Sequence, residues 1–237
     1  MNKYASLQEQ AFEANRELPR KGLVSETFGN VSAFDKDLGV FAIKPSGVPY
    51  PELTPETMVV LDLENRIVLG KLRPSSDTPT HRMLFRHFKG IRGICHTHSS
   101  FATAWAQAEK PIPVLGTTHA DLIHGDIPCT SVITDEQIEK QYEIETGQLI
   151  VDTFSHLSPL EVPMVLVARH GPFSWGTSAK QAVYHSVMLE ELARIAFHTL
   201  QINPKINRLK ASLIEKHFQR KHGPNAYYGQ EKSGNQR

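Results

Sequence analysis

Two histidines stand two positions apart in the stretch GICHTHSSF, residues 93–101, and they are the first residues of the chain that could do chemistry together. If the apolar run before them forms a β-strand, residues i and i+2 lie on one face of that strand. His96 and His98 placed in this way could hold one metal ion. The pair alone does not establish a metal site, because the chain has 12 histidines and most histidines are surface or core residues.

A third candidate ligand is His170, which ends the apolar run PMVLVARHG. Gly171 and Pro172 follow it and predict a sharp turn, which would present the imidazole at the edge of a sheet. Three neutral imidazoles with one open position form the usual shell of a catalytic zinc ion. The three histidines therefore predict a metal site if the fold brings them together.

Other residues compete for the ligand positions. Asp77, in SSDTPTH, could supply a carboxylate oxygen or could cap the helix that starts beside it, and from the sequence alone capping is the better interpretation. The spacing of the remaining histidines excludes none of His81, His119 and His124.

Three short segments combine glycine, hydroxyl and amide donors, the parts from which phosphate-binding nests are built. They are Gly29 with Asn30, the KPSG stretch from Lys44 to Gly47, and the PSS stretch from Pro74 to Ser76. Each segment alone is better explained as a β-turn without a ligand.

The composition limits the classes of function. The 237 residues include 40% hydrophobic and 22% charged residues, and the net charge of +1 gives no general attraction to nucleic acid or membrane. Cys95 and Cys129 form no Cys-x-x-Cys pattern, so neither a disulfide framework nor a thiolate zinc site is predicted. The N-terminus is too polar for a signal peptide and no apolar run is long enough to span a membrane, so we expect a cytoplasmic protein.

Several helices are indicated by their caps. The capping signals are Ser6 with Glu9, Thr78 with Pro79, Thr134 with Gln137, and Ser178. The first of these helices is expected to end at Pro19, the third is weakened by Gly147, and a last helix over residues 206–222 is expected to stop at Gly223.

Strands are predicted between these helices, at residues 29–34, 39–44, 93–98, 111–118 and 163–170. Residues 58–70 predict a hairpin that turns near Glu64 and Asn65. Helices and strands alternate without repeats or linkers, so we expect one α/β domain over residues 1–237 built in layers, with residues 231–237 disordered.

Seven motifs, taken in order, closely resemble the L-ribulose-5-phosphate 4-epimerase family, whose relatives include the class II fuculose-phosphate aldolases. The motifs are TFGNVSAFD, IKPSGV, PSSDTPTH, HTHSSFATAWAQA, GTTHAD, HGPFSWG and RKHGPNAYYGQ, and the match runs from about residue 7 to residue 230. The resemblance implies a three-layer aldolase-epimerase fold, with a largely antiparallel central sheet flanked by helices. It also implies a homotetramer whose active sites lie at subunit interfaces.

The resemblance further assigns residues to roles. It implies a Zn²⁺ ion, replaceable by Mn²⁺ or Co²⁺, bound by His96, His98 and His170, with Asp77 as a further ligand or near neighbour. Asp121 and Tyr228 would be the acid/base pair, with the tyrosine supplied by an adjacent subunit, and His217 is expected to act in the same site. The residues expected to hold the substrate and its phosphate are Gly29, Asn30, Lys44, Ser46, Gly47, Ser75, Ser76 and Thr117.

The implied reaction interconverts L-ribulose 5-phosphate and D-xylulose 5-phosphate by metal-assisted retro-aldol cleavage and rejoining of the C3–C4 bond. Bond cleavage is needed because C4 is not adjacent to the carbonyl, so a carbanion there would have no resonance stabilisation. The chain departs from the family pattern at Phe28, Phe101, Leu122 and His124. The changes at residues 28, 122 and 124 are expected to lie next to the substrate and could shift the sugar preference.

Three alternatives remain open from the sequence. A class II sugar-phosphate aldolase would share the metal ligands but release the two fragments. A basic C-terminal segment with interleaved aromatic residues, KHFQRKHGPNAYYGQ, could bind single-stranded nucleic acid, although a solvated helix end explains it better. A purely structural metal is disfavoured, because structural zinc sites usually have four closed ligands that often include cysteines.

Overall fold

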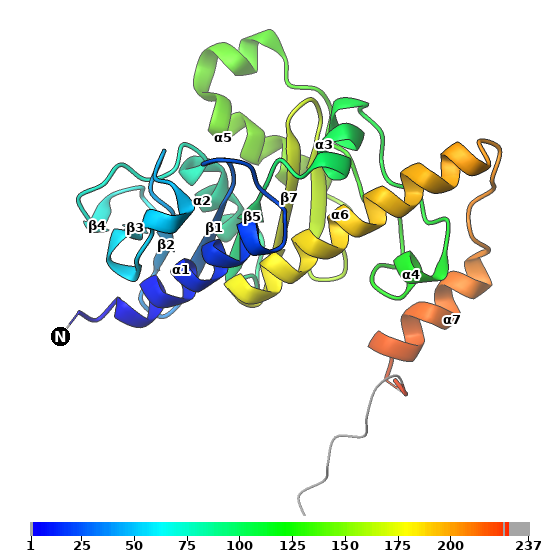
Figure 1. Ribbon diagram of the computed structural model, residues 1–237, viewed down its shortest axis with the longest axis horizontal. Helices are drawn as coiled ribbons and strands as arrows, with labels where there is room; N and C mark the ends of the chain where they lie inside the picture. Colours follow the sequence, from blue (N-terminus) through cyan, green and yellow to red (C-terminus); the bar gives the residue numbers. More distant parts are fainter. Residues whose placement is uncertain (1, 225, 228–237) are drawn as a thin grey trace, which may run out of the picture.

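The computed structural model describes residues 2–224, 226 and 227. Within these residues seven strands form one sheet in the order β4-β3-β2-β1-β5-β7-β6, and each neighbouring pair is antiparallel (Figure 1). The strands are β1 (Asn30–Asp35), β2 (Val40–Ile43), β3 (Val59–Asp62), β4 (Ile67–Leu69), β5 (Gly93–His96), β6 (Met164–Val167) and β7 (Gly171–Gly176).

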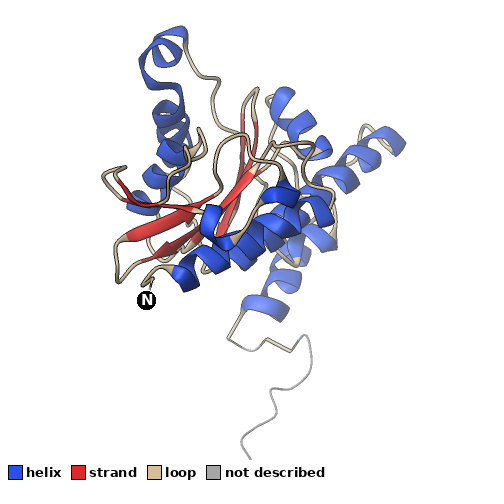
Figure 2. Cartoon of the chain, turned by 60° about the vertical axis from the view of Figure 1, so that its left-hand side comes forward, coloured by secondary structure: helices blue, strands red, loops and turns tan. Residues whose placement is uncertain are grey.

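Helices lie on both sides of this sheet (Figure 2). The helices are α1 (Ala5–Arg20), α2 (Thr78–His87), α3 (Ser100–Gln107), α4 (Thr117–Ala120), α5 (Asp135–Thr153), α6 (Ala179–Ile202) and α7 (Ala211–His222), with short 3₁₀ turns at Tyr50–Glu52 and Pro55–Thr57. None of the described helices is both long enough and apolar enough to cross a membrane.

Two hydrophobic cores cover the two faces of the sheet, because successive strand residues point to opposite faces. Phe41 and Ile43 of β2 pack in the core that contains side chains of α2 and α5. Val40 and Ala42 of the same strand pack in the other core, with side chains of α1 and the start of α6. The layered α/β arrangement with an antiparallel sheet is therefore as predicted.

Two of the four predicted caps, Ser178 and Thr134, begin helices as expected. The Ser178 hydroxyl accepts a hydrogen bond from the Gln181 backbone N–H at 3.1 Å, and Thr134 with Gln137 forms the capping box that starts α5. Gly223 follows the last residue of α7, as expected, but this helix begins only at Ala211, so the predicted first turns at residues 206–210 are not helical. The hairpin between β3 and β4 turns at Asn65, which has a positive φ of 72°.

Other local predictions were wrong. Helix α1 begins after Tyr4 with no side-chain cap, so Ser6 and Glu9 lie inside it, and it continues past Pro19 to Arg20. Its last turn closes because the Lys21 backbone N–H still reaches the Glu17 carbonyl oxygen. The strand predicted at residues 111–118 does not form in the described structure. This segment contains one isolated bridge, at Ile112, and the start of the short helix α4. Prolines on both sides of that isoleucine remove the backbone donors that a strand ladder needs.

The second half of α6 extends beyond the sheet, and α7 returns beside α4 (Figure 1). No residue of α7 is buried, whereas Ile195, Phe197 and Ile202 at the far end of α6 are apolar and exposed. This arm thus carries an apolar surface that the single chain leaves uncovered.

Gly93 marks a very close approach between β5 and the start of α6. A Cβ atom on residue 93 would lie 2.4 Å from the backbone N and Cα of Ala179. We expect Gly93→Ala to lower the free energy of unfolding by about 3 kcal/mol or more, because neither backbone can move without disturbing the sheet. Urea unfolding of wild type and Gly93→Ala would measure this difference in the free energy of unfolding.

The matched control for this change is Gly125→Ala. A Cβ there meets no atom within 4 Å, so the loss should be within about 1 kcal/mol. Equal losses for the two variants would contradict the close packing at Gly93.

Candidate metal and anion site

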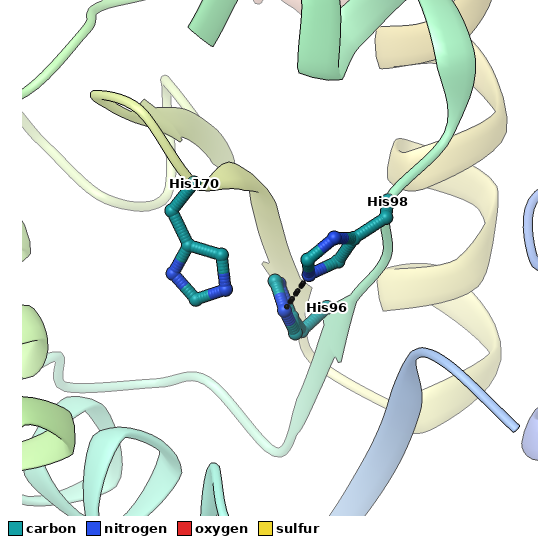
Figure 3. Close-up of side chains that lie close together, drawn as sticks. All are labelled: His96, His98 and His170. Atoms are coloured by element: carbon teal, nitrogen blue, oxygen red, sulfur yellow. Dashed lines mark hydrogen bonds between the residues drawn. The ribbon is translucent and has the colours of Figure 1, made fainter. Parts of the chain in front are cut away.

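The three predicted histidine ligands meet in space. His96 is the last residue of β5, His98 lies in the loop that follows, and His170 lies in the turn between β6 and β7 (Figure 3). Their ligand-capable nitrogen atoms all lie within 4.8 Å of one another. The Nε2 atoms of His96 and His98 are 3.1 Å apart, close to the separation of about 3.3 Å that bonds of 2.0–2.1 Å to a tetrahedral ion require.

The register of the sheet produces this meeting. His96 of β5 is paired with Asn30 at the start of β1 on one side and with Phe173 near the start of β7 on the other. The site therefore lies at an edge where three neighbouring strands begin or end. Cys95 points to the opposite face, in the core with α1.

Two details of the prediction differ from the structure. His98 lies beyond the end of β5, so the two histidines do not share one strand face; the chain bends between them before α3 begins. The turn after the apolar strand is at Arg169, which has a positive φ of 62°, and Gly171 already begins β7. The strand β7 was not recognised because its first residues, glycine and proline, resemble a turn in sequence.

Asp77 occupies the N-cap position of α2, but its side chain makes no capping hydrogen bond. The prediction that it caps the helix was therefore wrong, and so was Thr78 as the cap, since Thr78 is the first helical residue. The Asp77 carboxylate accepts a hydrogen bond from the Asn30 amide at 2.6 Å, and its Oδ2 lies 4.0 Å from Nε2 of His96. This carboxylate thus borders the histidine cluster.

The charges around Asp77 favour its ionised form. Burial alone would raise the pKa of this carboxyl, but the neighbouring His96 and His81 and the Asn30 amide outweigh burial and lower it. A carboxylate is therefore present beside the three imidazoles.

The surroundings of the three imidazoles favour lone pairs that face the centre of the cluster. Burial, followed by repulsion from His96, lowers the pKa of His98 and of His170 below the ordinary value. His96 donates from Nδ1 to the Pro172 carbonyl oxygen at 3.0 Å, which leaves Nε2 to face the other two rings. Three imidazoles plus one carboxylate form a donor set that fits Zn²⁺ and also Mn²⁺ or Co²⁺.

The three predicted anion segments come together beside the histidines. Pro45 and Pro74 form an isolated antiparallel bridge, supported by hydrogen bonds from Ser46 N to the Arg73 oxygen and from Ser75 N to the Lys44 oxygen. The Asn30 amide also donates to the Ser75 hydroxyl at 3.1 Å. Segments that are up to 47 residues apart in the chain are thus tied into one wall.

A cavity of about 400 Å³ joins the histidine cluster to this wall. The predicted residues that line it are Gly29, Asn30, Lys44, Ser46, Gly47, Ser75, Ser76, Asp77, His96, His98 and His170. Lys44 is the cation among them; its ammonium group donates to the Thr27 carbonyl oxygen at 3.2 Å, and burial lowers its pKa. Asn30 Oδ1 is buried and has no hydrogen-bond partner, which leaves it available to a ligand.

The other predicted site residues lie elsewhere. Thr117 begins α4 and Asp121 follows it, and neither lines this cavity. Asp121 accepts hydrogen bonds from His217 Nδ1 and Arg220 Nε, each at 2.9 Å. Desolvation opposes its ionisation, but these two α7 side chains lower the pKa of Asp121 to about 2. Tyr228 lies outside the described residues.

Sequence reasoning missed two residues of the cavity wall, Tyr142 and Glu143 of α5. They reach the cavity because α5 is interrupted at Gln141, where φ is −147° and ψ is 83°. Nothing in the local sequence signals this interruption. Phe28 also lines the cavity and stacks on His98 with ring centroids 5.7 Å apart, so this departure from the family pattern does lie in the site.

The competing histidines have other partners. His81 Nδ1 lies 2.7 Å from the Ser32 hydroxyl, His119 donates from Nε2 to the Gly125 carbonyl oxygen, and His124 pairs with Glu215. In the described part of the chain, none of the three belongs to the cluster that could hold an ion.

His81 makes a prediction about pH. It is fully buried, and burial lowers its pKa from 6.5 to about 3. Between these values the unfolded chain binds a proton that the folded chain does not, so the stability from the neutral ring is complete above pH 6.5 and falls on acidification. The free energy of unfolding can fall by at most about 5 kcal/mol through this effect.

We therefore expect His81→Gln to flatten the decline of stability between pH 6.5 and pH 3 in the presence of a chelator. Urea unfolding across this range measures the slope, and His124→Gln serves as the exposed control. An unchanged slope in His81→Gln would rule out a neutral buried ring.

Known proteins resemble this chain over most of its length. The family model described as the class II aldolase and adducin N-terminal domain matches residues 9–197. The solved structure of an L-fuculose 1-phosphate aldolase is 22% identical and covers 90% of this chain and 94% of its own, with a TM-score of 0.78. YgbL from Klebsiella pneumoniae, described as a putative aldolase/epimerase/decarboxylase, is 26% identical over 89% of this chain and 97% of its own, with a TM-score of 0.71.

An L-fuculose-1-phosphate aldolase from Thermus thermophilus is 24% identical and covers 86% of this chain and 100% of its own, with a TM-score of 0.64. These likenesses confirm the fold that the sequence resemblance implied.

Proposed function

Because the chain belongs to the class II aldolase and adducin N-terminal domain family, we propose that it is a sugar-phosphate enzyme of the L-ribulose-5-phosphate 4-epimerase type. It would interconvert L-ribulose 5-phosphate and D-xylulose 5-phosphate. The observation that carries this proposal is the single cavity that joins the three histidines and Asp77 to an anion-binding wall.

The chemistry explains why both halves of the cavity are needed. His96, His98 and His170 would hold a divalent ion with Asp77 beside it, and such an ion acts as a Lewis acid toward negative charge that develops on substrate oxygens. The retro-aldol step produces such charge when the C3–C4 bond breaks.

The anion wall would hold the phosphate of the departing fragment. Lys44 supplies the positive charge, and the hydroxyls of Ser46, Ser75 and Ser76 supply hydrogen-bond donors. With its phosphate anchored, the aldehyde fragment can rotate and be attacked on its opposite face. Rejoining the C3–C4 bond on that face inverts C4, which is the epimerisation.

The acid/base groups would come from a neighbouring copy of the chain. Protons must be transferred at the C4 oxygen on either face of the aldehyde, and we assign these transfers to Asp121 and Tyr228, with His217 held against Asp121 at 2.9 Å. Two observations support a shared site: Asp121 does not line the cavity of its own chain, and the arm that carries α7 has an exposed apolar surface. A homotetramer would bring the two halves together.

A class II aldolase is the second candidate. Three of the similar solved structures are L-fuculose-1-phosphate aldolases, which favours fragment release as a real alternative. The metal and anion halves of the cavity serve both reactions equally. The two functions differ only in whether the fragments rejoin before they leave.

An assay of purified, metal-analysed protein on L-ribulose 5-phosphate tests the proposal. Formation of D-xylulose 5-phosphate, followed by a coupled enzyme, together with loss of that activity on chelation, would support the epimerase. Free glycolaldehyde phosphate and dihydroxyacetone appearing at the turnover rate would favour the aldolase instead. No reaction by metal-loaded protein would refute both for this substrate, and Phe28 would be the first residue to examine for a changed sugar preference.

A further inference from the structure

Tyr142 is not one of the proposed metal ligands, but it contacts one of them. Its hydroxyl oxygen lies 3.3 Å from Nδ1 of His170, and it lines the same cavity. We infer that Tyr142 is a positioning residue that fixes the ring of the third histidine ligand. This inference rests on the metal site of the proposed function and adds to it a residue that does not bind the ion.

The two nitrogens of His170 face different neighbours. Figure 3 shows one ring nitrogen on the side of His96 and His98 and the other on the far side. Because Nδ1 is the atom beside Tyr142, Nε2 is the atom left for the cluster. A ligand histidine usually donates from its second nitrogen to a nearby oxygen, which sets both its tautomer and its ring orientation. Here Nδ1–H would donate to the Tyr142 oxygen.

His170 needs such a partner more than His96 does. His96 is the last residue of a strand that is paired on both sides, is only 2% exposed, and is oriented by the Pro172 carbonyl oxygen. His170 lies in the turn between β6 and β7, next to Arg169 with its positive φ. Strand pairing therefore does not by itself orient the His170 ring, and a side chain from another element can.

The interruption of α5 places Tyr142, and it is held in several ways. The Thr80 hydroxyl of α2 donates to the Glu143 carbonyl oxygen at 2.6 Å. The Thr146 hydroxyl donates to the carbonyl oxygen of Tyr142 itself at 2.8 Å. The carbonyl groups near the interruption thus have defined partners, and one of these partners lies three residues after Asp77.

A close approach of α5 to α2 completes the arrangement. Gly147 lies so near α2 that a Cβ atom would stand 2.8 Å from Cβ of Met83. The glycine that weakened the helix prediction therefore has a packing role. Tyr142 thus belongs to a helix, α5, that packs directly against α2, the helix that Asp77 precedes. The packing of α5 on α2 therefore helps to position both the Asp77 carboxylate and, through Tyr142, the His170 ring.

The test is the metal affinity of Tyr142→Phe, which removes one oxygen atom and keeps the ring. We expect the dissociation constant for Zn²⁺, measured by competition with a chromophoric chelator, to rise about 10- to 100-fold. The visible absorption bands of the Co²⁺-loaded protein should also change, because they report ligand geometry. A side chain with only a structural role would move neither measurement at constant folded structure.

Tyr184→Phe is the matched control, because Tyr184 is an exposed tyrosine on α6 outside the cavity. Circular dichroism and the thermal midpoint establish that both variants fold. If wild type and Tyr142→Phe bind Zn²⁺ equally tightly and give identical Co²⁺ spectra, the positioning role is refuted. If wild type binds no more Zn²⁺ than His96→Asn does, the metal site of the proposed function fails instead, so the two failures are distinguishable.

Discussion

His96→Asn is expected to lower kcat on L-ribulose 5-phosphate by at least about 10³-fold, because a Lewis acid worth several kcal/mol would be lost from the reacting centre. Asparagine keeps a nitrogen donor near the position of Nδ1, so the bond to the Pro172 carbonyl oxygen can survive. It lacks the Nε2 lone pair that faces His98. Steady-state kinetics measures the fall in kcat, and metal analysis of the same sample measures the loss of the bound ion.

The matched control is His185→Asn. His185 is also a buried histidine whose Nδ1 donates to a backbone oxygen, that of Trp175, but it stands outside the cluster. Any general damage from replacing a buried histidine should appear in both variants. Metal removal from wild type should reproduce the loss seen in His96→Asn and be reversed by added Zn²⁺. Full activity in metal-free protein would contradict the proposal.

Asp121→Asn is the second change with a large expected effect. A carboxylate that transfers a proton in the transition state typically contributes about 10²- to 10⁴-fold, so kcat should fall within this range. Zn²⁺ binding should be unchanged, since Asp121 does not line the metal cavity of its own chain. The control Glu215→Gln weakens another contact between α7 and the α4 region, with His124, and should retain activity.

Mixed oligomers test whether the site is shared. Refolding His96→Asn together with Asp121→Asn in equal amounts would pair an intact metal half with an intact acid/base half at about one interface in four. We expect activity to return to about that fraction of wild type. Mixtures as inactive as the separate variants would show that both residues must belong to one chain, and the proposed interface would be abandoned.

Some interactions within a few residues of one another were predictable from the sequence, although two of the four predicted helix caps were wrong. Ser178 and Thr134 cap their helices by bonds to residues three positions away, so the chain segment alone determines them. The hairpin turn at Asn65 is equally local. The clustering of the three histidines was also predicted, although only the resemblance to a family selected His170 and Asp77 among several candidates.

Features that depend on distant contacts were not predictable. Asp77 looks like a helix cap until β1 brings the amide of Asn30, 47 residues away, within 2.6 Å of its carboxylate. Tyr142 enters the site only because α5 is interrupted beside Thr80 of α2. Asp121 pairs with α7 residues about 100 positions later in the chain. In each case the deciding partner comes from another element of the fold.

The pairing of β5 with β1 and β7 gives the ion a further consequence for folding. A slip of one residue along β5 would exchange its two faces and put Cys95 in place of His96 opposite Asn30. Such a mispaired chain would lose the site, so it could not take up the ion. An ion present at about 100 times its Kd would add about 2.7 kcal/mol to the correctly registered sheet alone. Metal binding would then stabilise only those chains in which β5 is correctly aligned with β1 and β7.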